Sequence, residues 1–286
     1  MAAEFDFIVV GGGSAGAVIA SRLSEDPGCR VALIEAGERP PEISSLPIAP
    51  AAMQLNPTTD WMYTADPGKA GLGLNGRRIP VPRGKMLGGS SGINYMVYVR
   101  GHPGDFDSWA EGGATGWGYA DVLPYFRKSE GLAPSEEIVV DAPAHNTTGP
   151  LGVSVRAPVL PAAQQFVGAA VAAGIPRGDY NGRDRGGAAG FVSLTQTTTR
   201  GGKRSSTYVA FLAGEPENRS NLTIITGALV RRNSLQRRDR TNHGYRRPCL
   251  YTTAMSGKRP LMCTRVFWND RFLAKRKHWR LTRSRR

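Results

Sequence analysis

Apolar residues near the start of the chain form a short continuous run and then a helical stripe. The run covers 5–10 and leads directly into the glycine-rich segment 11–16. Ala15, Ile19 and Leu23 then recur every four residues, which places them on one face of a helix. The pattern predicts a buried strand, a glycine turn and an amphipathic helix.

A second apolar run, 30–34, follows this helix and ends at Glu35. Strand, glycine turn, helix, strand and acid therefore come in the order of a dinucleotide-binding βαβ unit. The expected fold class is α/β, with a Rossmann-like domain that binds a dinucleotide.

The residues of this unit suit the phosphates of a dinucleotide. Gly11 permits the tight turn, Gly13 lets backbone N–H groups approach a pyrophosphate, and Gly16 lets the helix pack on the strand. The helix N-terminus adds partial positive charge and free N–H donors. Glu35 would accept hydrogen bonds from ribose hydroxyls, and its charge disfavours the 2′-phosphate of NADP. The alternative is a glycine-rich turn that binds nothing.

A second segment rich in glycine and serine covers 84–94 and precedes the stretch 95–101. Its small residues allow close backbone approach, and Ser90, Ser91 and Asn94 add hydrogen-bonding groups. Taken alone, the segment also fits an ordinary loop and helix start, with Ser91 or Asn94 as the cap.

Residues 88–92 also match GxSxG, the nucleophile elbow of serine hydrolases, with Ser90 as the nucleophile. That elbow requires a buried strand directly before it. Pro80 and Pro82 make a poor central strand, because each proline removes a ladder donor. We therefore expect no hydrolase site here.

The two glycine-rich segments together resemble the glucose–methanol–choline (GMC) oxidoreductases, FAD-dependent enzymes that oxidise alcohols. The segment GKMLGGSSGINYMVYVRG is similar to the first signature of that family. The resemblance covers roughly residues 4–230, and its further motifs lie at 60–63, 105–109, 116–119, 122–126, 179–182, 204–206 and 221–225.

The resemblance implies that the chain binds FAD and that its substrate is a small-molecule alcohol, which passes hydride to the flavin. It implies the following contacts with FAD: Gly11, Gly13, Ser14, Ala15 and Gly16 at the pyrophosphate, Glu35 at the adenosine ribose, Leu87, Ser91, Asn94, Tyr95, Met96 and Val97 at the isoalloxazine and its phosphoryl arm, and Val230 at the adenine. Val230 would end a strand over 222–230 and approach the adenine through its backbone.

The resemblance also implies a more detailed fold and a domain order. The α/β fold would be an FAD-binding Rossmann-like (βαβ) domain with the beginning of an α+β substrate domain and an irregular basic C-terminal tail. The first part of the FAD-binding domain would cover 1–150, a partial substrate domain 151–200, and a return to the FAD-binding domain 201–230. A basic tail would then cover 231–286. Within the substrate part, we expect the Ala- and Val-rich helix 162–173 to belong to a core.

The charge of the chain changes the interpretation of this tail. The formal net charge is +14. The residues from Arg231 onward hold 18 of the 37 Lys and Arg and two of the 23 Asp and Glu. The body is therefore close to neutral, and nucleic acid is expected as a partner only through the tail.

No catalytic residue can be named from this sequence. The resemblance implies a catalytic His far downstream, paired with a second His or Asn. None of the four histidines stands in such a stretch: His102, His145, His243 and His278. We therefore expect the chain as given to be an inactive, truncated portion, with 231–286 translated out of frame. A basic arm on a relic nucleotide fold, binding nucleic acid or an anionic surface, and an inert tail are the alternatives.

Three sparse cysteines (Cys29, Cys249 and Cys263) give no disulfide framework and no CxxC metal pattern. No apolar run reaches the roughly 18–20 residues that span a bilayer. The N-terminus has no basic region of a secretory signal. The expected location is cytoplasmic.

Overall fold

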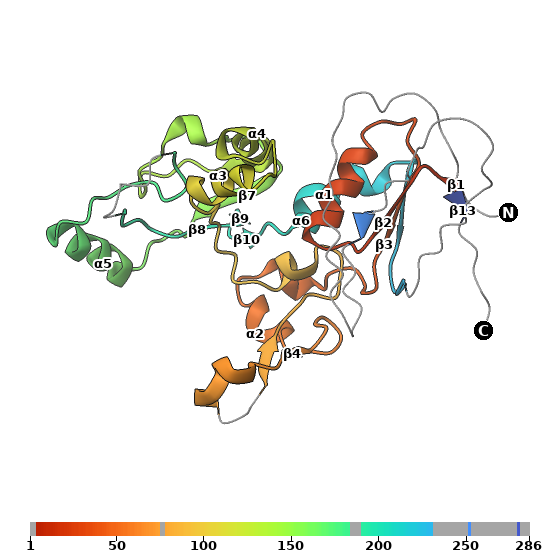
Figure 1. The fold of residues 1–286 in the computed structure, drawn as a ribbon, viewed down its shortest axis with the longest axis horizontal. Helices are drawn as coiled ribbons and strands as arrows, with labels where there is room; N and C mark the ends of the chain where they lie inside the picture. The colour runs from red at the N-terminus through yellow and green to blue at the C-terminus, as the bar shows by residue number, and fades with distance from the viewer. Residues whose placement is uncertain (1–3, 75–77, 184–189, 231–250, 253–278, 281–286) are drawn as a thin grey trace. The chain divides into compact units, whose positions relative to one another are not determined.

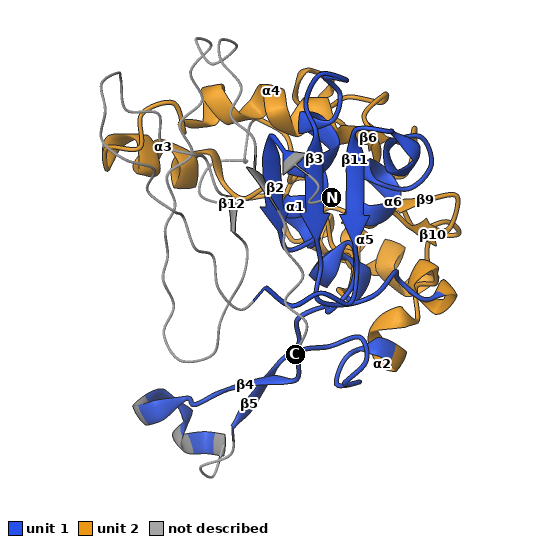
Figure 2. Cartoon of the chain, turned by 90° about the vertical axis from the view of Figure 1, so that its right-hand side faces the viewer, with its two compact units in different colours: residues 1–41, 53–93, 207–286 blue, residues 42–52, 94–206 orange. Residues whose placement is uncertain are grey.

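The computed structural model describes residues 4–74, 78–183, 190–230, 251–252 and 279–280. Figure 1 shows the ribbon, and Figure 2 colours its two compact units. Unit 1 comprises 1–41, 53–93 and 207–286, and unit 2 comprises 42–52 and 94–206. The assignment of ranges to a cofactor domain and a substrate domain stays a prediction.

Unit 1 is built on a parallel sheet with the strand order β11-β3-β2-β12, and helix α1 connects β2 to β3. Every neighbouring pair in this sheet is parallel. The bounds are β2 Phe7–Val10, α1 Ser14–Leu23, β3 Val31–Ile34, β11 Leu222–Ile225 and β12 Tyr251–Thr252. The predicted α/β class and its βαβ unit are confirmed.

The core of unit 1 explains why these residues form these elements. Ala17 and Ala20 are fully buried on α1 and pack against Val31 and Leu33 of β3. Because both sheet faces are covered, β3 is buried at all four positions and reads as a continuous apolar run. Leu87, Leu212 and Leu222, far apart in sequence, complete the same cluster.

Two predicted strands are shorter in the structure. The first run is interrupted at Asp6, whose carboxylate accepts the Arg30 backbone N–H at 2.8 Å. The last strand, expected over 222–230, ends at Ile225. Gly227 adopts a φ of 62°, and its N–H bonds to the Gly37 carbonyl at 2.9 Å instead of continuing the ladder.

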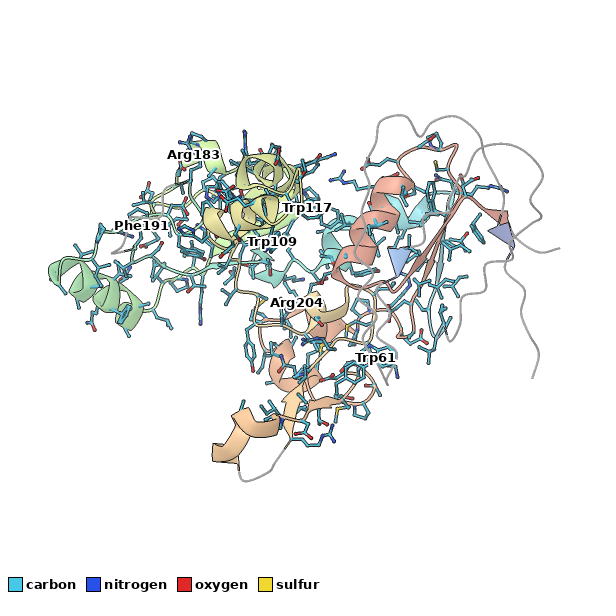
Figure 3. All side chains as sticks on the ribbon, viewed as in Figure 1. Trp61, Trp109, Trp117, Arg183, Phe191 and Arg204 are labelled. Carbon is cyan, nitrogen blue, oxygen red and sulfur yellow. The ribbon has the colours of Figure 1, made fainter. Side chains whose placement is uncertain are left out.

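Asp60 organises a turn of unit 1 beside Trp61, which Figure 3 labels. Its buried carboxylate accepts the backbone N–H groups of Leu55 (2.8 Å), Met62 (3.0 Å) and Arg83 (2.9 Å). Leu55 and Met62 both have a positive φ, which costs energy for a non-glycine residue. The carboxylate stabilises this conformation, so the motif at 60–63 has a structural function.

The remaining elements of unit 1 are short. They are β1 Glu4–Phe5, paired antiparallel with β13 Trp279–Arg280; β4 Tyr63–Ala65, paired antiparallel with β5 Ile79–Val81; η2 Gly68–Leu74; η3 Gly89–Gly92; α6 Thr207–Phe211; and η6 Pro216–Asn218. Within the tail, the structure describes β12 and β13. The expectation of an out-of-frame tail otherwise concerns residues outside the described ones.

Unit 2 contains a three-stranded sheet, β6-β7-β8, in which β6 and β7 are parallel and β7 and β8 antiparallel. Its elements are η1 Glu42–Ser45, most of α2 Ala49–Met53, α3 Pro103–Glu111, α4 Tyr119–Ser129, β6 Glu130–Leu132, η4 Ala142–Ala144, β7 Leu151–Val155, α5 Pro161–Ala172, β8 Gln196–Thr197, β9 Thr199–Arg200 and β10 Lys203–Arg204. No helix among the described residues is both long and apolar enough to cross a membrane.

The apolar helix α5 is less buried than its composition predicts. Val167 is buried with Ile138, Val192 and Leu194, but Phe166 is 71% exposed. The expectation that this helix belongs to a core is therefore wrong for most of its length. An Ala- and Val-rich composition raises apolarity on every face, so it does not reveal which face packs.

The interior of unit 2 holds a network of four charged side chains. Glu130 forms an ion pair with Arg100 at 2.8 Å and bonds to His145 Nδ1 at 2.9 Å. His145 Nε2 lies 2.8 Å from Asp179. All four side chains are buried. Two positive and two negative charges balance when His145 is protonated, which is the condition under which burying such groups costs least.

The surroundings of His145 favour its protonated form. Burial by itself lowers the pKa of His145, but the hydrogen bonds and charges of Asp179 and Glu130 outweigh burial and raise this pKa to about 9. For Asp179, burial raises the pKa. The hydrogen bonds from His145 and from two backbone N–H groups lower it by more, so the pKa of Asp179 lies below its usual value.

We expect unit 2 to lose stability in alkali. Because the folded-state pKa of His145 is raised, its stabilisation is complete below about pH 6.5 and is lost as the pH rises through about 9. Urea unfolding at pH 6.5 and at pH 10 should differ by roughly 3 kcal/mol from this residue. His145→Gln should unfold more easily and should lack this pH dependence.

His102→Gln is the matched control, because His102 is an exposed N-cap of α3 whose Nδ1 accepts the Gly104 N–H at 3.0 Å. It should retain the alkaline loss. The same loss in His145→Gln as in the unmodified chain, or an NMR titration of His145 near 6.5, would contradict the prediction.

Candidate functional site

The glycine turn after β2 places the start of α1 against the sheet. Gly11 has a φ of 92°, which a side chain would strain, and its N–H bonds to the Ile34 carbonyl at 2.7 Å. A Cβ on Gly16 would lie 1.8 Å from the Gly11 carbonyl oxygen. Gly16 therefore allows the helix–strand contact that the sequence predicted.

The N-terminus of α1 is open. Gly13 is its N-cap, with φ −71° and ψ −163°, and no side chain caps the helix. The first turn carries no acid, and Ser14 and Ala15 are exposed. The first N–H groups of a helix lack intrahelical partners and carry partial positive charge. This end of α1 is therefore suited to an anion.

Glu35 lies at the end of β3 and connects two loops. Its Oε2 accepts the Gly12 N–H at 2.6 Å, and its Oε1 accepts the Gly37 N–H at 2.8 Å. The residue is buried. Each carboxylate oxygen has two acceptor sites, so hydroxyl donors can still be accepted. The ribose contact stays a prediction, and the two backbone bonds are a function that the sequence did not reveal.

The second glycine-rich segment packs directly on the first within unit 1. The Gly88 N–H bonds to the Gly12 carbonyl at 2.7 Å. A Cβ on Gly12 would lie 2.7 Å from Leu87 Cδ2, and one on Gly89 would lie 2.7 Å from Gly13 Cα. The structure therefore brings the two segments together, although residues 17–83 lie between them in the chain. Leu87 is fully buried. Its contact with the flavin stays a prediction.

Ser91 connects the second segment to α6. Its Oγ bonds to the Gly88 carbonyl at 2.6 Å and lies 3.0 Å from both the backbone N and the Oγ1 of Thr207. The hydroxyl thus holds the start of α6, which lies 116 residues later in the chain. Its predicted cofactor contact stays a prediction.

Ser90 does not stand on a nucleophile elbow. The residues around it form the 3₁₀ helix η3, and the nearest preceding strand, β5, ends at Val81. The Ser90 Oγ accepts the Gly84 N–H at 3.2 Å. The strand-to-helix turn that exposes a catalytic serine is therefore replaced by a bonded loop.

The residues 94–97 belong to unit 2 and form a turn of their own. Asn94 Oδ1 accepts the Met96 N–H at 3.1 Å, and Met96 has a φ of 63°. Tyr95 and Val97 are 71% and 56% exposed, whereas Met96 is buried. The turn therefore exposes alternate side chains to solvent. Its contact with the flavin stays a prediction.

Val230 is half-buried and lies five residues beyond the end of β11. The adenine contact expected there came from a strand that would reach residue 230. That contact stays a prediction, but the strand that was expected to place Val230 at the adenine ends at Ile225.

Both described histidines have structural functions. His102 caps α3, and His145 is buried between Glu130 and Asp179. His243 and His278 lie outside the described residues.

Comparison with known proteins identifies the family of this chain. The model of the GMC oxidoreductases matches residues 5–248, so the match extends past Val230 into the basic segment. The oxygen-dependent choline dehydrogenase of Pseudomonas putida is 41% identical over 240 residues, which cover 81% of this chain and 40% of that protein.

Solved structures agree. Pyridoxine 4-oxidase from Mesorbium loti matches with a TM-score of 0.72 and 36% identity, over 81% of this chain and 44% of that one. An FAD-dependent oxidoreductase from Chaetomium thermophilum matches with a TM-score of 0.67 and 30% identity, over 77% and 38%. The chain spans about 40% of the length of the curated relatives it matches. It belongs to the GMC oxidoreductase family, whose cofactor is FAD.

Proposed function

We propose that this chain binds FAD through unit 1 and acts in the oxidation of a CH–OH group of a small alcohol. The observation that carries the proposal is the packing of two glycine-rich segments around the start of α1, with Glu35 beside them. Such an arrangement leaves backbone N–H groups and one carboxylate for a dinucleotide.

The residues present fit the phosphates and ribose of FAD. A Cβ on Gly13 would meet no described atom closer than 4.0 Å, so this position leaves room that a side chain would fill. The first turn of α1 carries no acid that would repel a phosphate. Glu35 adds acceptors for hydroxyl groups at the end of the neighbouring strand.

When bound, FAD supplies an acceptor for hydride from an alcohol carbon. The relatives named above act on choline and on pyridoxine, which supports a small polar alcohol as the substrate. The described histidines are both held by structural bonds. The role that we assign to the described residues is therefore cofactor binding.

Two further expectations from the sequence stay proposals. Binding of nucleic acid through the basic tail would involve residues 231–286, which are largely outside the described ones. A cytoplasmic location likewise rests on the sequence alone.

The function is tested on the full 286-residue chain purified without added flavin and then mixed with FAD. Flavin absorbance that comigrates with the protein, together with quenched flavin fluorescence, is expected. A chain that folds, by circular dichroism, and neither retains nor quenches FAD would refute the proposal.

Gly13→Ala should separate cofactor binding from folding. The backbone at Gly13 has a negative φ, and its new methyl group would lie 4.0 Å from the nearest described atom. The free energy of unfolding should therefore change by less than about 1 kcal/mol. The methyl group would occupy the approach to the pyrophosphate, so FAD affinity should fall roughly ten-fold or more.

Gly168→Ala is the control for this change, because it adds the same methyl group inside α5 with nothing within 4 Å. It should bind FAD as the unmodified chain does. Unchanged FAD affinity in Gly13→Ala would place the pyrophosphate elsewhere.

Glu35→Gln should weaken both the loop structure and FAD binding. The amide keeps one acceptor and turns an NH₂ group toward a backbone N–H, either of Gly12 or of Gly37. Loss of one hydrogen bond to a charged group should cost about 2 kcal/mol in urea unfolding. FAD affinity should fall as well, because the acceptor for ribose is lost.

Glu38→Gln serves as the control, since Glu38 is an exposed acid in the same loop. It should affect neither quantity. Full stability and full FAD affinity in Glu35→Gln would show that the carboxylate has neither role.

A further inference from the structure

Unit 2 contains a cavity that is lined by residues of β6, β7, β9 and the loops that join them. Its volume is about 440 Å³, which lies within the range of pockets that hold small molecules. Leu132 and Val153 belong to its buried lining, and Thr147 and Thr148 to its exposed lining. Every lining residue belongs to unit 2, so the cavity is a feature of that unit alone.

Arg200 is the only ionisable residue among the described residues that line this cavity. The other lining residues are glycine, proline, threonine, alanine, valine and leucine. No carboxylate is among these lining residues to neutralise the charge of Arg200. The cavity therefore combines one positive charge with largely apolar walls.

Two glycines on neighbouring strands make room for the Arg200 side chain. Gly131 of β6 and Gly152 of β7 are partners in the parallel register of these strands. A Cβ on Gly131 would lie 2.8 Å from Arg200 Nη2, and one on Gly152 would lie 2.6 Å from Arg200 Cβ and 2.9 Å from its Nε. These distances are too short for a real side chain, so the Arg200 side chain lies across the glycine pair.

One hydrogen bond restricts the orientation of the guanidinium. Arg200 Nη2 donates to the Gly149 carbonyl at 3.0 Å, and the Gly149 N–H is itself bonded to the Glu130 carbonyl at 2.8 Å. A guanidinium has five N–H donors, so four donors remain after this bond. Because Arg200 is exposed, these donors are accessible to a ligand. A planar fork of N–H donors matches the two oxygens of a carboxylate.

We propose that this cavity binds a small organic carboxylate, with the carboxylate on Arg200 and the apolar part of the ligand against Leu132, Pro150 and Val153. A single positive charge suits a carboxylate better than a phosphate group, which carries close to two negative charges at neutral pH. Apolar walls stabilise only a ligand that has a hydrocarbon part. The site is additional to the proposed FAD-binding function and does not depend on it.

Titration calorimetry of the full chain with sodium benzoate, without flavin, tests the site. Benzamide is the matched uncharged probe, because it keeps the ring and replaces the carboxylate with an amide. Benzoate should bind at least ten-fold more tightly than benzamide, since charge-assisted hydrogen bonds are stronger than neutral ones. Acetate lacks the ring and should bind at least ten-fold more weakly than benzoate.

Arg200→Met should lower the affinity for benzoate at least ten-fold, because the charged donors are lost. Arg200→Lys keeps the charge without the planar fork and should lower this affinity by less. Arg156→Met is the matched control. It removes an exposed arginine of unit 2 that follows β7 and does not line the cavity, so benzoate affinity should not change.

Amide hydrogen exchange of the full chain, read by mass spectrometry, locates the bound benzoate. Exchange in segments 131–134 and 147–150, which line the cavity, should become slower with benzoate in the unmodified chain and not in Arg200→Met. Slower exchange only in other segments would place the ligand elsewhere and overturn the proposal.

The remaining outcomes also decide. Equal benzoate affinity in Arg200→Met and in the unmodified chain overturns the role of Arg200. Inorganic phosphate that binds more tightly than benzoate, or acetate that binds equally tightly, overturns the organic ligand class. No measurable benzoate binding by the folded chain overturns the whole proposal. If Arg200→Met does not fold, Arg200→Lys decides: lower affinity with an unchanged unfolding transition supports the site, and unchanged affinity overturns it.

Discussion

The carboxylate of Glu35 holds together the two loops that follow β2 and β3 in unit 1. One oxygen bonds to the turn that follows β2, and the other bonds to the loop that follows β3. Backbone N–H groups in such turns have no ladder partner and are costly to bury unpaired. A buried acid at this position satisfies two of them and leaves further lone pairs facing the end of the sheet.

The glycines near this carboxylate allow the two glycine-rich segments to pack closely. Gly12 and Gly89 come from segments far apart in sequence, and each would strike the opposite segment if it carried a Cβ. Gly88 adds a direct backbone bond to Gly12. The second segment therefore packs closely on the first, which explains why the family resemblance depends on two glycine-rich segments that are separate along the chain.

Local patterns could predict the βαβ unit because its strand, turn and helix are all specified within about thirty residues. They could not predict that Ser91 would hold α6 or that β11 would end before Gly227, because both depend on contacts with distant segments. The charged network of unit 2 was likewise missed. Arg100, Glu130, His145 and Asp179 are scattered in sequence, and no spacing rule joins them.

The same network also bears on the turn that carries Asn94. Asn181 bonds to two of its residues: its N–H donates to Asp179 Oδ1 at 2.9 Å, and its Oδ1 accepts the Arg100 N–H at 3.0 Å. The Asn181 Nδ2 donates to the Tyr98 carbonyl and to Gln196 Oε1, both at 2.9 Å. The Tyr98 N–H bonds to the Gln196 carbonyl, two residues before Thr198 bonds to Met96. The segment 94–100 is thus held at one end by Arg204, which donates to Asn94 Oδ1 at 2.7 Å, and at the other by the buried charges around Arg100. Because hydrogen-bonded charges tolerate little displacement, the interior of unit 2 fixes the turn 94–97 together with the turn's own Asn94.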